Sequence, residues 1–246
     1  LDQADEMDIL EANGSVNFGS NKAYRAMLKK IKAGSPATNP DDLQYILDNV
    51  DVDNLFEYMA LEMFVGNSDI GNIRYYRLHQ EGSKWKWIWY DADYGLYSSK
   101  FNSPWSYLKV KGMGEQKIDN TIFLKLLEHP DYKRKFLEKL ADVYKTFTTE
   151  YMTQVLDGVL AEIQPEMKNH WERWGELNDK AVTSEVPTTI DGAYTYWESR
   201  VNRLYNTLKV RPHRLWDFIK DEFKLTKTEM EELFGPQPDY PDDAVL

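Results

Sequence analysis

One short segment, residues 73–90, departs from the helical spacing that patterns most of this chain. Its two halves, residues 73–78 and 84–90, are rich in aromatic and β-branched side chains. Gly82 lies between them in a polar stretch suited to a tight turn. The pattern predicts a small two-stranded antiparallel hairpin within a mainly α (α+β) fold.

Apolar residues recur at helical spacing on both sides of this hairpin. Helices are expected over residues 23–31, 43–47, 55–64, 122–127, 132–144, 151–174, 193–208, 212–223 and 227–234. Asp53 is expected to cap the third of them, Pro165 to break the sixth and Pro212 to open the second of two closing helices. The remaining stretches indicate a polar segment with a turn, a long loop, a polar gap around Pro187 and an extended, poorly ordered tail: residues 5–21, 96–120, 175–192 and 235–246.

The composition narrows the classes of function. A net charge of −11 and a pI near 4.9 disfavour binding to nucleic acid or to an anionic membrane surface, and no local basic patch stands out. The absence of cysteine excludes thiol catalysis, thiolate metal sites and disulfides. No apolar run approaches the roughly 20 residues that span a bilayer, so no membrane insertion is expected. The four histidines include no pair at i, i+4, and the common phosphate-binding loops and nucleophile motifs are absent.

Two polar clusters bracket the hairpin. The stretch "GNSDIGN" before it contains Asn67, Asp69 and Asn72, and "YDADYG" after it contains Asp91 and Asp93. Antiparallel strands bring their outer ends together, so the two clusters are expected to meet. Oxygen-rich groups of this kind suit Mg²⁺ and phosphoryl transfer, and protein kinases place their acids in the same order around a hairpin. The pattern predicts a phosphate or metal site, with two solvated turns as the alternative.

Carbohydrate chemistry is a further alternative for the same region. Three tryptophans share one face of the second strand, where we expect them to be buried core, although they could instead form an exposed platform for sugar rings: Trp85, Trp87 and Trp89. The two aspartates after the strand could also be the acid pair of a glycosidase, with a glutamate of the preceding helix nearby: Asp91 and Asp93 with Glu62 or Glu57.

The same residues resemble the CotH family of spore-coat-related atypical kinases. The resemblance begins with "VDVDNLFEYMALEMFVGNSDIGNIRYYRL" and "KWKWIWYDADYGL", which surround the two polar clusters. It continues through "LLEHPDYKRKFLEKLADVY", "IQPEMKNHWERWG" and "VNRLYNTLKVRPHRLWDFI", in the order of the family pattern. It covers about residues 5–223, nearly the whole chain.

This resemblance implies the C-terminal lobe of a protein-kinase-like fold that binds ATP with Mg²⁺ or Mn²⁺. It implies phosphorylation of Ser/Thr hydroxyls on a secreted, surface or coat protein, and a bacterial location that is extracellular, at the cell surface or in the spore coat. Asp69 would be the catalytic acid that orients the acceptor hydroxyl. Asp93, with Asp91 as the competing choice, would hold the metal against the nucleotide phosphates. Asn72 would be a second metal contact, while Asn67 would hold the loop.

The chain departs from the family pattern in two ways. Only Ile70 and Gly71 separate Asp69 from Asn72, an interval shorter than in the family, and this can move Asn72 off the metal. The small lobe that covers ATP is expected before Leu1, together with any export signal, so residues 1–225 would form the large lobe and residues 226–246 a short helix and tail. The fragment alone would then be inactive. The main alternative is a non-catalytic assembly module of a cell surface or spore coat with a degenerate kinase site.

Overall fold

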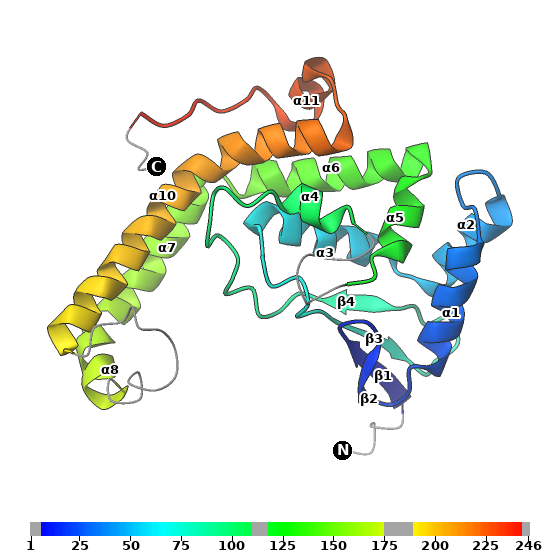
Figure 1. Ribbon diagram of the computed structural model, residues 1–246, viewed down its shortest axis with the longest axis horizontal. Helices are drawn as coiled ribbons and strands as arrows, with labels where there is room; N and C mark the ends of the chain where they lie inside the picture. The colour runs from blue at the N-terminus through cyan, green and yellow to red at the C-terminus, as the bar shows by residue number, and fades with distance from the viewer. Residues whose placement is uncertain (1–5, 110–117, 175–188, 243–246) are drawn as a thin grey trace. The chain divides into compact units, whose positions relative to one another are not determined.

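A computed structural model describes residues 6–109, 118–174 and 189–242 (Figure 1). Residues 110–117 of the expected 96–120 loop, residues 175–188 of the gap around Pro187 and the last four residues of the tail lie outside these ranges. The chain forms two compact units, described separately below. The first combines Leu1–Thr146 with Arg214–Gln237, and the second combines Phe147–His213 with Pro238–Leu246.

The first unit contains a four-stranded antiparallel sheet in the order β2-β1-β3-β4. Its strands are β1 (Met7–Glu11), β2 (Ser15–Phe18), β3 (Arg74–Leu78) and β4 (Lys86–Ile88). The predicted hairpin is confirmed as β3 and β4, with Tyr75 opposite Trp87. The expectation of only two strands is wrong, because β1 pairs along the whole of β3.

The N-terminal hairpin escaped prediction because a buried acid hides the alternation of β1. Leu10 and Asp8 are both buried in that strand. The Asp8 carboxylate accepts a hydrogen bond from the backbone N–H of Ser20 at 2.7 Å and lies 3.1 Å from His79 Nε2. A carboxylate whose oxygens are hydrogen-bonded can occupy a buried position in a strand. The polar residue Asp8 therefore did not indicate a loop.

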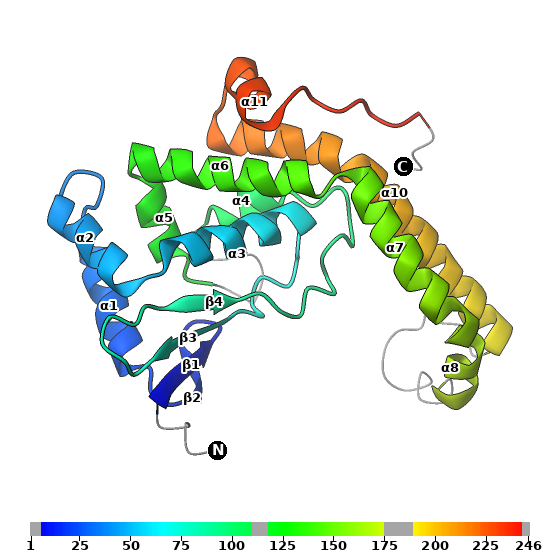
Figure 2. The ribbon, with the colours of Figure 1, turned by 180° about the vertical axis from the view of Figure 1, so that it is seen from behind.

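Helices cover the sheet and make up most of the first unit. They are α1 (Lys22–Ala33), α2 (Pro40–Asn49), α3 (Val52–Val65), α4 (Ser103–Tyr107), α5 (Thr121–Leu127), α6 (Pro130–Thr146), the last ten residues of α10 (Ile190–Phe223) and α11 (Lys227–Phe234). Figures 1 and 2 both show α3 between the sheet and α6. Phe56 of α3 packs edge-on against Phe123 and Phe136, with ring centroids 6.1 and 5.4 Å away. The core therefore lies on both sides of α3, which is the central helix of the unit.

The ends of three elements differ from the sequence-based expectation. Asp51, not Asp53, caps α3, because its side chain accepts the backbone N–H of Asn54 at 3.1 Å. Helix α4 lies inside the segment expected to be a loop, and Asn102 caps it. The two expected closing helices are one helix of 34 residues, with Pro212 in its interior rather than at its start. Pro212 thus marks no helix boundary here, although proline usually breaks helices.

The second unit is helical throughout its described residues. It contains α7 (Thr149–Ile163), a 3-10 turn (Gln164–Glu166), α8 (Met167–Trp174) and residues 190–213 of α10. The 3-10 turn holds Pro165, which confirms the predicted break. Thr149 ties α7 to α10 through a 3.0 Å hydrogen bond to the carbonyl of Leu208. Arg211 of α10 is buried, and burial lowers its pKa to about 9.

Candidate functional site

The first polar cluster follows the end of α3 directly. Gly66 ends the helix in the left-handed conformation, with φ of 65°, which a residue without a side chain adopts most readily. Asn67 is then buried and accepts the backbone N–H of Asp69 through its Oδ1 at 3.0 Å. Asp69 itself is partly buried, and its Oδ1 is enclosed without a hydrogen-bond partner among the described residues. The loop therefore presents a carboxylate oxygen that is unpaired within the described part of the chain.

The second polar cluster is fastened to the same helix. Asn54 of α3 holds the free edge of β4, accepting the backbone N–H of Trp87 at 2.6 Å and donating to its carbonyl at 3.1 Å. Further along, the backbone N–H of Leu96 donates to the carbonyl of Val65 at 2.6 Å. Gly95 permits this approach, since a Cβ there would lie 2.8 Å from the Ala92 carbonyl oxygen. Residues 91 and 93 thus lie between two attachments to α3.

The two clusters meet, as the antiparallel hairpin predicted. Asn72 donates from its side-chain amide to the Asp91 carboxylate and accepts the hydroxyl of Tyr90. Burial raises the pKa of that Tyr90 hydroxyl, and the charges of Asp91 and Asp69 act in the same direction. Both carboxylates therefore act electrostatically on one hydroxyl group. Asn72 and Asp91 are already engaged with each other.

Asp93 differs from Asp91 in being available. Its side chain is exposed and has no hydrogen bond or ion pair to the described part of the chain. Asp91 adopts a positive φ of 52°, a conformation that aspartate tolerates better than most residues. The turn therefore directs Asp91 toward Asn72 and leaves Asp93 in solvent.

Sequence reasoning missed the structural role of Glu62. This residue, considered earlier only as a glycosidase partner, is 1% exposed near the end of α3. Burial raises the pKa of its carboxyl group, and the hydrogen bond from Tyr107 opposes that effect. The Tyr107 hydroxyl lies 2.8 Å from Glu62 Oε2. The only signal in the sequence was a glutamate set among the apolar residues "MALEMF".

The tryptophan row is only partly core. Trp85 and Trp87 are buried, and their rings pack near Tyr75 with centroids 5.9 and 5.7 Å away. The expectation that Trp89 is also buried is wrong, since 44% of it is exposed. Strand β4 ends at Ile88, so the alternation that placed the three rings on one buried face does not extend to Trp89. With two of three rings buried, the row forms no exposed platform for sugar.

The described side chains can be compared with the ligands that Mg²⁺ and a nucleotide require. Among the described residues, no group of three histidine or acidic side chains is placed to hold a metal ion. Mg²⁺ in phosphoryl-transfer sites, however, is held by one or two carboxylates and completed by phosphate oxygens and water. The unpaired Asp69 oxygen and the exposed Asp93 carboxylate suit that kind of site. A metal held mainly by nucleotide fits, whereas a metal held by the protein alone does not.

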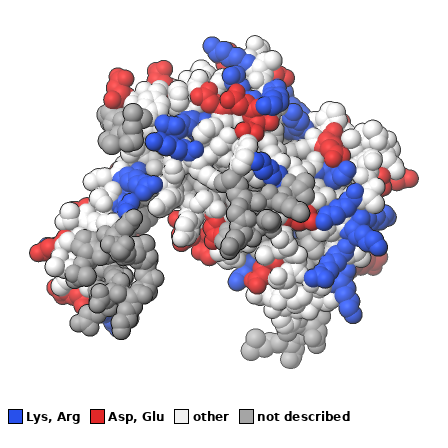
Figure 3. Space-filling view, viewed as in Figure 1, with Lys and Arg blue, Asp and Glu red and all other residues white. Residues whose placement is uncertain are grey.

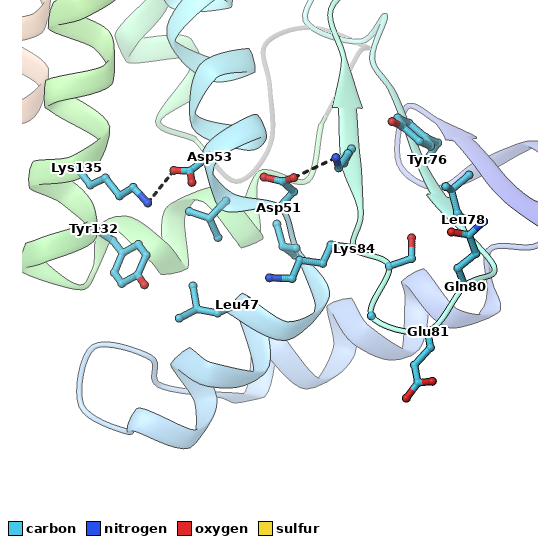
Figure 4. A pocket seen from close by; sticks show the side chains of 15 residues that line it. Leu47, Asp51, Asp53, Tyr76, Leu78, Gln80, Glu81, Lys84, Tyr132 and Lys135 are labelled. Atoms are coloured by element: carbon cyan, nitrogen blue, oxygen red, sulfur yellow. Dashed lines mark ion pairs between the residues drawn. The ribbon is translucent and has the colours of Figure 1, made fainter.

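A pocket lies at the end of the hairpin opposite the two acidic clusters. It has a volume of about 540 Å³ between the turn after β3, the ends of α2 and α3, and α6. Figure 4 shows the ion pair of Asp53 with Lys135 on one wall, and Asp51 pairs with Lys86. The residues that line this pocket include none of the candidate site residues. This pocket is therefore separate from the acidic clusters.

The charged side chains on the surface test the expectation that the chain has no local basic patch. Figure 3 shows lysine and arginine gathered over α1, where Lys22, Arg25, Lys29 and Lys32 recur at spacings of three and four residues. The expectation of no local basic patch is therefore wrong at α1, because helical spacing brings these cations to one side. Lys32 is paired with Asp119. No helix in the described ranges is both long and apolar enough to cross a membrane.

Comparison with known protein families identifies the family of this chain. A family model described as CotH kinase protein matches residues 3–215. Comparison with curated proteins gave no match, and comparison with solved structures gave none. The family supports a kinase-like function, dependent in general on a nucleotide and a metal and directed at a protein substrate. Because the match spans most of its 246 residues, this chain belongs to the CotH kinase family.

Proposed function

We propose that the complete polypeptide transfers the γ-phosphoryl group of ATP to Ser/Thr hydroxyls of a secreted, surface or coat protein. In this proposal the protein acts outside the cell, at the cell surface or in the spore coat, and this fragment alone is inactive. The observation that carries the proposal is the Asp69 carboxylate, whose Oδ1 is buried without a partner in the described part of the protein. An unpaired buried carboxylate oxygen is costly, and a ligand group that pairs with it removes the cost.

In this proposal Asp69 accepts a hydrogen bond from the acceptor hydroxyl and orients its oxygen toward the γ-phosphorus. The hydroxyl oxygen forms the new bond to phosphorus, the bond to the leaving ADP oxygen breaks, and the hydroxyl proton passes to the Asp69 carboxylate. Asp93 is the metal-binding carboxylate, with Asp91 and Asn72 as the adjacent candidates. Bound Mg²⁺ would neutralise charge on the nucleotide phosphates.

A second candidate function is a non-catalytic assembly module. It is favoured by the hydrogen bonds among Asn72, Asp91 and Tyr90, which occupy two of the four candidate side chains within the protein itself. A degenerate site tolerates such internal pairing, whereas a metal site needs these oxygens available. The kinase proposal therefore depends on Asp69 and Asp93 more than on Asn72.

The test is transfer of radiolabelled phosphate from ATP by the complete polypeptide, with Mg²⁺ or Mn²⁺ and a protein acceptor. Asp69→Asn and Asp93→Asn are expected to lower the rate by about 100-fold or more, since each removes a charge used in the transition state. Asp53→Asn is the matched control, because Asp53 is an exposed aspartate at the other end of α3. Equal labelling by all four proteins would reject the kinase proposal and favour the assembly module.

A further inference from the structure

Tyr107, the last residue of α4, places its hydroxyl between two acceptors at the C-terminal end of α3. The side chain is buried, and its oxygen lies 2.8 Å from Glu62 Oε2 and 3.2 Å from the carbonyl oxygen of Asn67. A tyrosine hydroxyl has one hydrogen to donate, so the two acceptors share it. Burial raises the pKa of this hydroxyl well above its ordinary value, and the charge of Glu62 acts in the same direction. Tyr107 therefore remains a hydrogen-bond donor at neutral pH.

Helix α4 is itself attached to its neighbours, which gives the Tyr107 hydroxyl a fixed position. The buried hydroxyl of Ser103 donates to the carbonyl oxygen of Met63 in α3. At the other end of α4, the buried amide of Asn120 donates to the carbonyl oxygen of Tyr107 at 2.9 Å. Buried polar groups that are hydrogen-bonded in this way rigidify the structure around them. The hydroxyl therefore reaches α3 and the loop after it from a helix that is fastened at both ends.

The other side of this contact is the loop that carries Asp69. The backbone N–H of Asn67 donates to the carbonyl oxygen of Glu62 at 3.3 Å, and Asn67 Oδ1 accepts the backbone N–H of Asp69 at 3.0 Å. The carbonyl oxygen of Asn67 faces the Tyr107 hydroxyl. The buried residue Asn67 is thus bonded to the helix end, to Tyr107 and to the backbone of Asp69. A displacement of Asn67 would move the backbone of Asp69 with it.

We propose that Tyr107 is a positioning residue, whose hydroxyl holds the Asp69 loop against the C-terminal end of α3 through Glu62 and Asn67. The proposal rests on the proposed function and adds to it a residue that acts through Asn67 rather than on the reacting groups. Tyr107→Phe removes the hydroxyl and keeps the ring, so the packing of the ring is preserved. It leaves the Asn67 carbonyl and the Glu62 carboxylate without this donor. A buried acceptor that loses its donor is costly, so the loop is expected to shift.

The first experiment uses the complete polypeptide and measures kcat and the KM for ATP. Tyr107→Phe is expected to lower kcat by about 10- to 100-fold, since small misplacements of reacting groups have effects of that size. The KM for ATP is expected to stay within about three-fold, because positioning acts on the chemical step. Tyr144→Phe is the matched control and is expected to match the wild type, because Tyr144 is a buried tyrosine of α6 whose ring packs against Phe234. An unchanged kcat in Tyr107→Phe, or a change confined to KM, would overturn the proposal.

A second variant keeps the test decisive if Tyr107→Phe folds poorly. Asn67→Ala removes the side-chain acceptor of the Asp69 N–H, which is the next link of the same path. It is expected to lower kcat about as much as Tyr107→Phe. The double variant is expected to be no slower than the slower single variant, since both substitutions release the same loop. Multiplied effects in the double variant would contradict a path through Asn67, as would wild-type kinetics of Asn67→Ala.

Hydrogen exchange separates this proposal from the proposed function, because it needs no activity. The amide of Asp69 is held by Asn67, so Tyr107→Phe is expected to accelerate exchange in a peptide covering residues 67–72, and Tyr144→Phe is not. Faster exchange in this peptide alone, without any phosphoryl transfer by the wild type, would reject the kinase function yet retain Tyr107 as the residue that holds the loop. Unchanged exchange in Tyr107→Phe, or equal acceleration in a reference peptide from α6, would overturn the positioning role, whatever the activity.

Discussion

The two ends of helix α3 place their acidic side chains in different surroundings. At the N-terminal end, the partly exposed ion pairs Asp51–Lys86 and Asp53–Lys135 line an open pocket of about 540 Å³. At the C-terminal end, the buried carboxylate of Glu62 accepts a hydrogen bond from the Tyr107 hydroxyl at 2.8 Å, and the same hydroxyl lies 3.2 Å from the carbonyl oxygen of Asn67. Ion pairs in water contribute little, whereas a satisfied buried network fixes positions. The ion pairs at the first end are therefore expected to tolerate change, whereas the buried contacts at the second end hold the loop that carries Asp69.

This contrast shows that open volume alone does not identify the chemistry of a protein. Ligand sites are usually concave, which would favour the pocket at the N-terminal end. That pocket is lined in part by the ion pairs Asp51–Lys86 and Asp53–Lys135, whereas the C-terminal end carries Asp69, whose buried Oδ1 has no hydrogen-bond partner among the described residues. Unpaired buried groups are uncommon and call for an explanation. In the proposed function, the acceptor hydroxyl is the partner of this oxygen.

The largest effect is expected from Trp85, which ties β4 to the start of α3. Trp85 is fully buried, its carbonyl accepts the Asp51 N–H at 3.0 Å, and its ring lies 5.1 Å from that of Tyr24. Trp85→Ala should lower the free energy of unfolding by about 3–5 kcal/mol, the usual cost of emptying a large aromatic site. Urea unfolding of the purified chain measures it. The pocket end is thus held by apolar burial more than by its ion pairs.

Trp85→Phe serves as the matched control for that prediction. The indole N–H of Trp85 is buried without a hydrogen-bond partner among the described residues. Phenylalanine therefore loses packing but no hydrogen bond, and we expect less than half of the loss caused by alanine. If alanine and phenylalanine cost the same, the indole nitrogen has a partner and burial alone does not explain the role of Trp85.

The next largest effect is expected from Asn54, which lies in the first turn of α3. Its amide satisfies both backbone groups of Trp87 on the free edge of β4, at 2.6 and 3.1 Å. Asn54→Ala leaves that N–H and C=O without this partner, and we expect a loss of about 2–3 kcal/mol in the free energy of unfolding. Glu57→Ala, an exposed change on the same helix, should be nearly neutral. Comparable losses in the two variants would mean that the edge contact contributes little.

The sequence carried enough information for the hairpin and for the helix before it. Aromatic alternation located β3 and β4, and the apolar stripe ending at Gly66 located α3 and its C-terminal end. Antiparallel pairing then required the two polar clusters to meet, and Asn72 with Asp91 show that they do. These features depend on local periodicity and chain connectivity, which a single sequence displays directly.

The sequence did not show which buried polar side chains find hydrogen-bond partners in the folded protein. Asp8 in β1 and Glu62 in α3 are buried acids whose partners come from distant segments, and no local pattern predicts such pairing. Trp89 differs from Trp87 only because β4 stops at Ile88, and strand ends are set by tertiary contacts. The missed parts of the candidate site are therefore its supports, while the acidic residues themselves could be read from the sequence.

A smaller effect should distinguish the two aspartates at the start of α3. Asp51 accepts the Asn54 N–H and is the N-cap, so Asp51→Ala should cost about 1 kcal/mol in unfolding free energy. Asp53 lies inside the first turn, where it favours the helix dipole and forms an exposed ion pair with Lys135, so Asp53→Ala should cost less. Thermal unfolding of both variants tests the order. A larger loss for Asp53→Ala would restore the capping role that its sequence position suggested.

The smallest effect is expected from Lys135, whose ammonium lies 2.7 Å from Asp53 Oδ1 on the wall of the pocket. The two side chains are 49% and 72% exposed, so water and salt screen the pair. Lys135→Met keeps most of the aliphatic stem and should change the unfolding free energy by at most about 0.5 kcal/mol. Unfolding in low and high salt checks this, because a screened pair loses its contribution as salt rises. A loss above about 2 kcal/mol that persists in high salt would show that the pocket end is as tightly specified as the Glu62 end, and the contrast between the two ends of α3 would no longer hold.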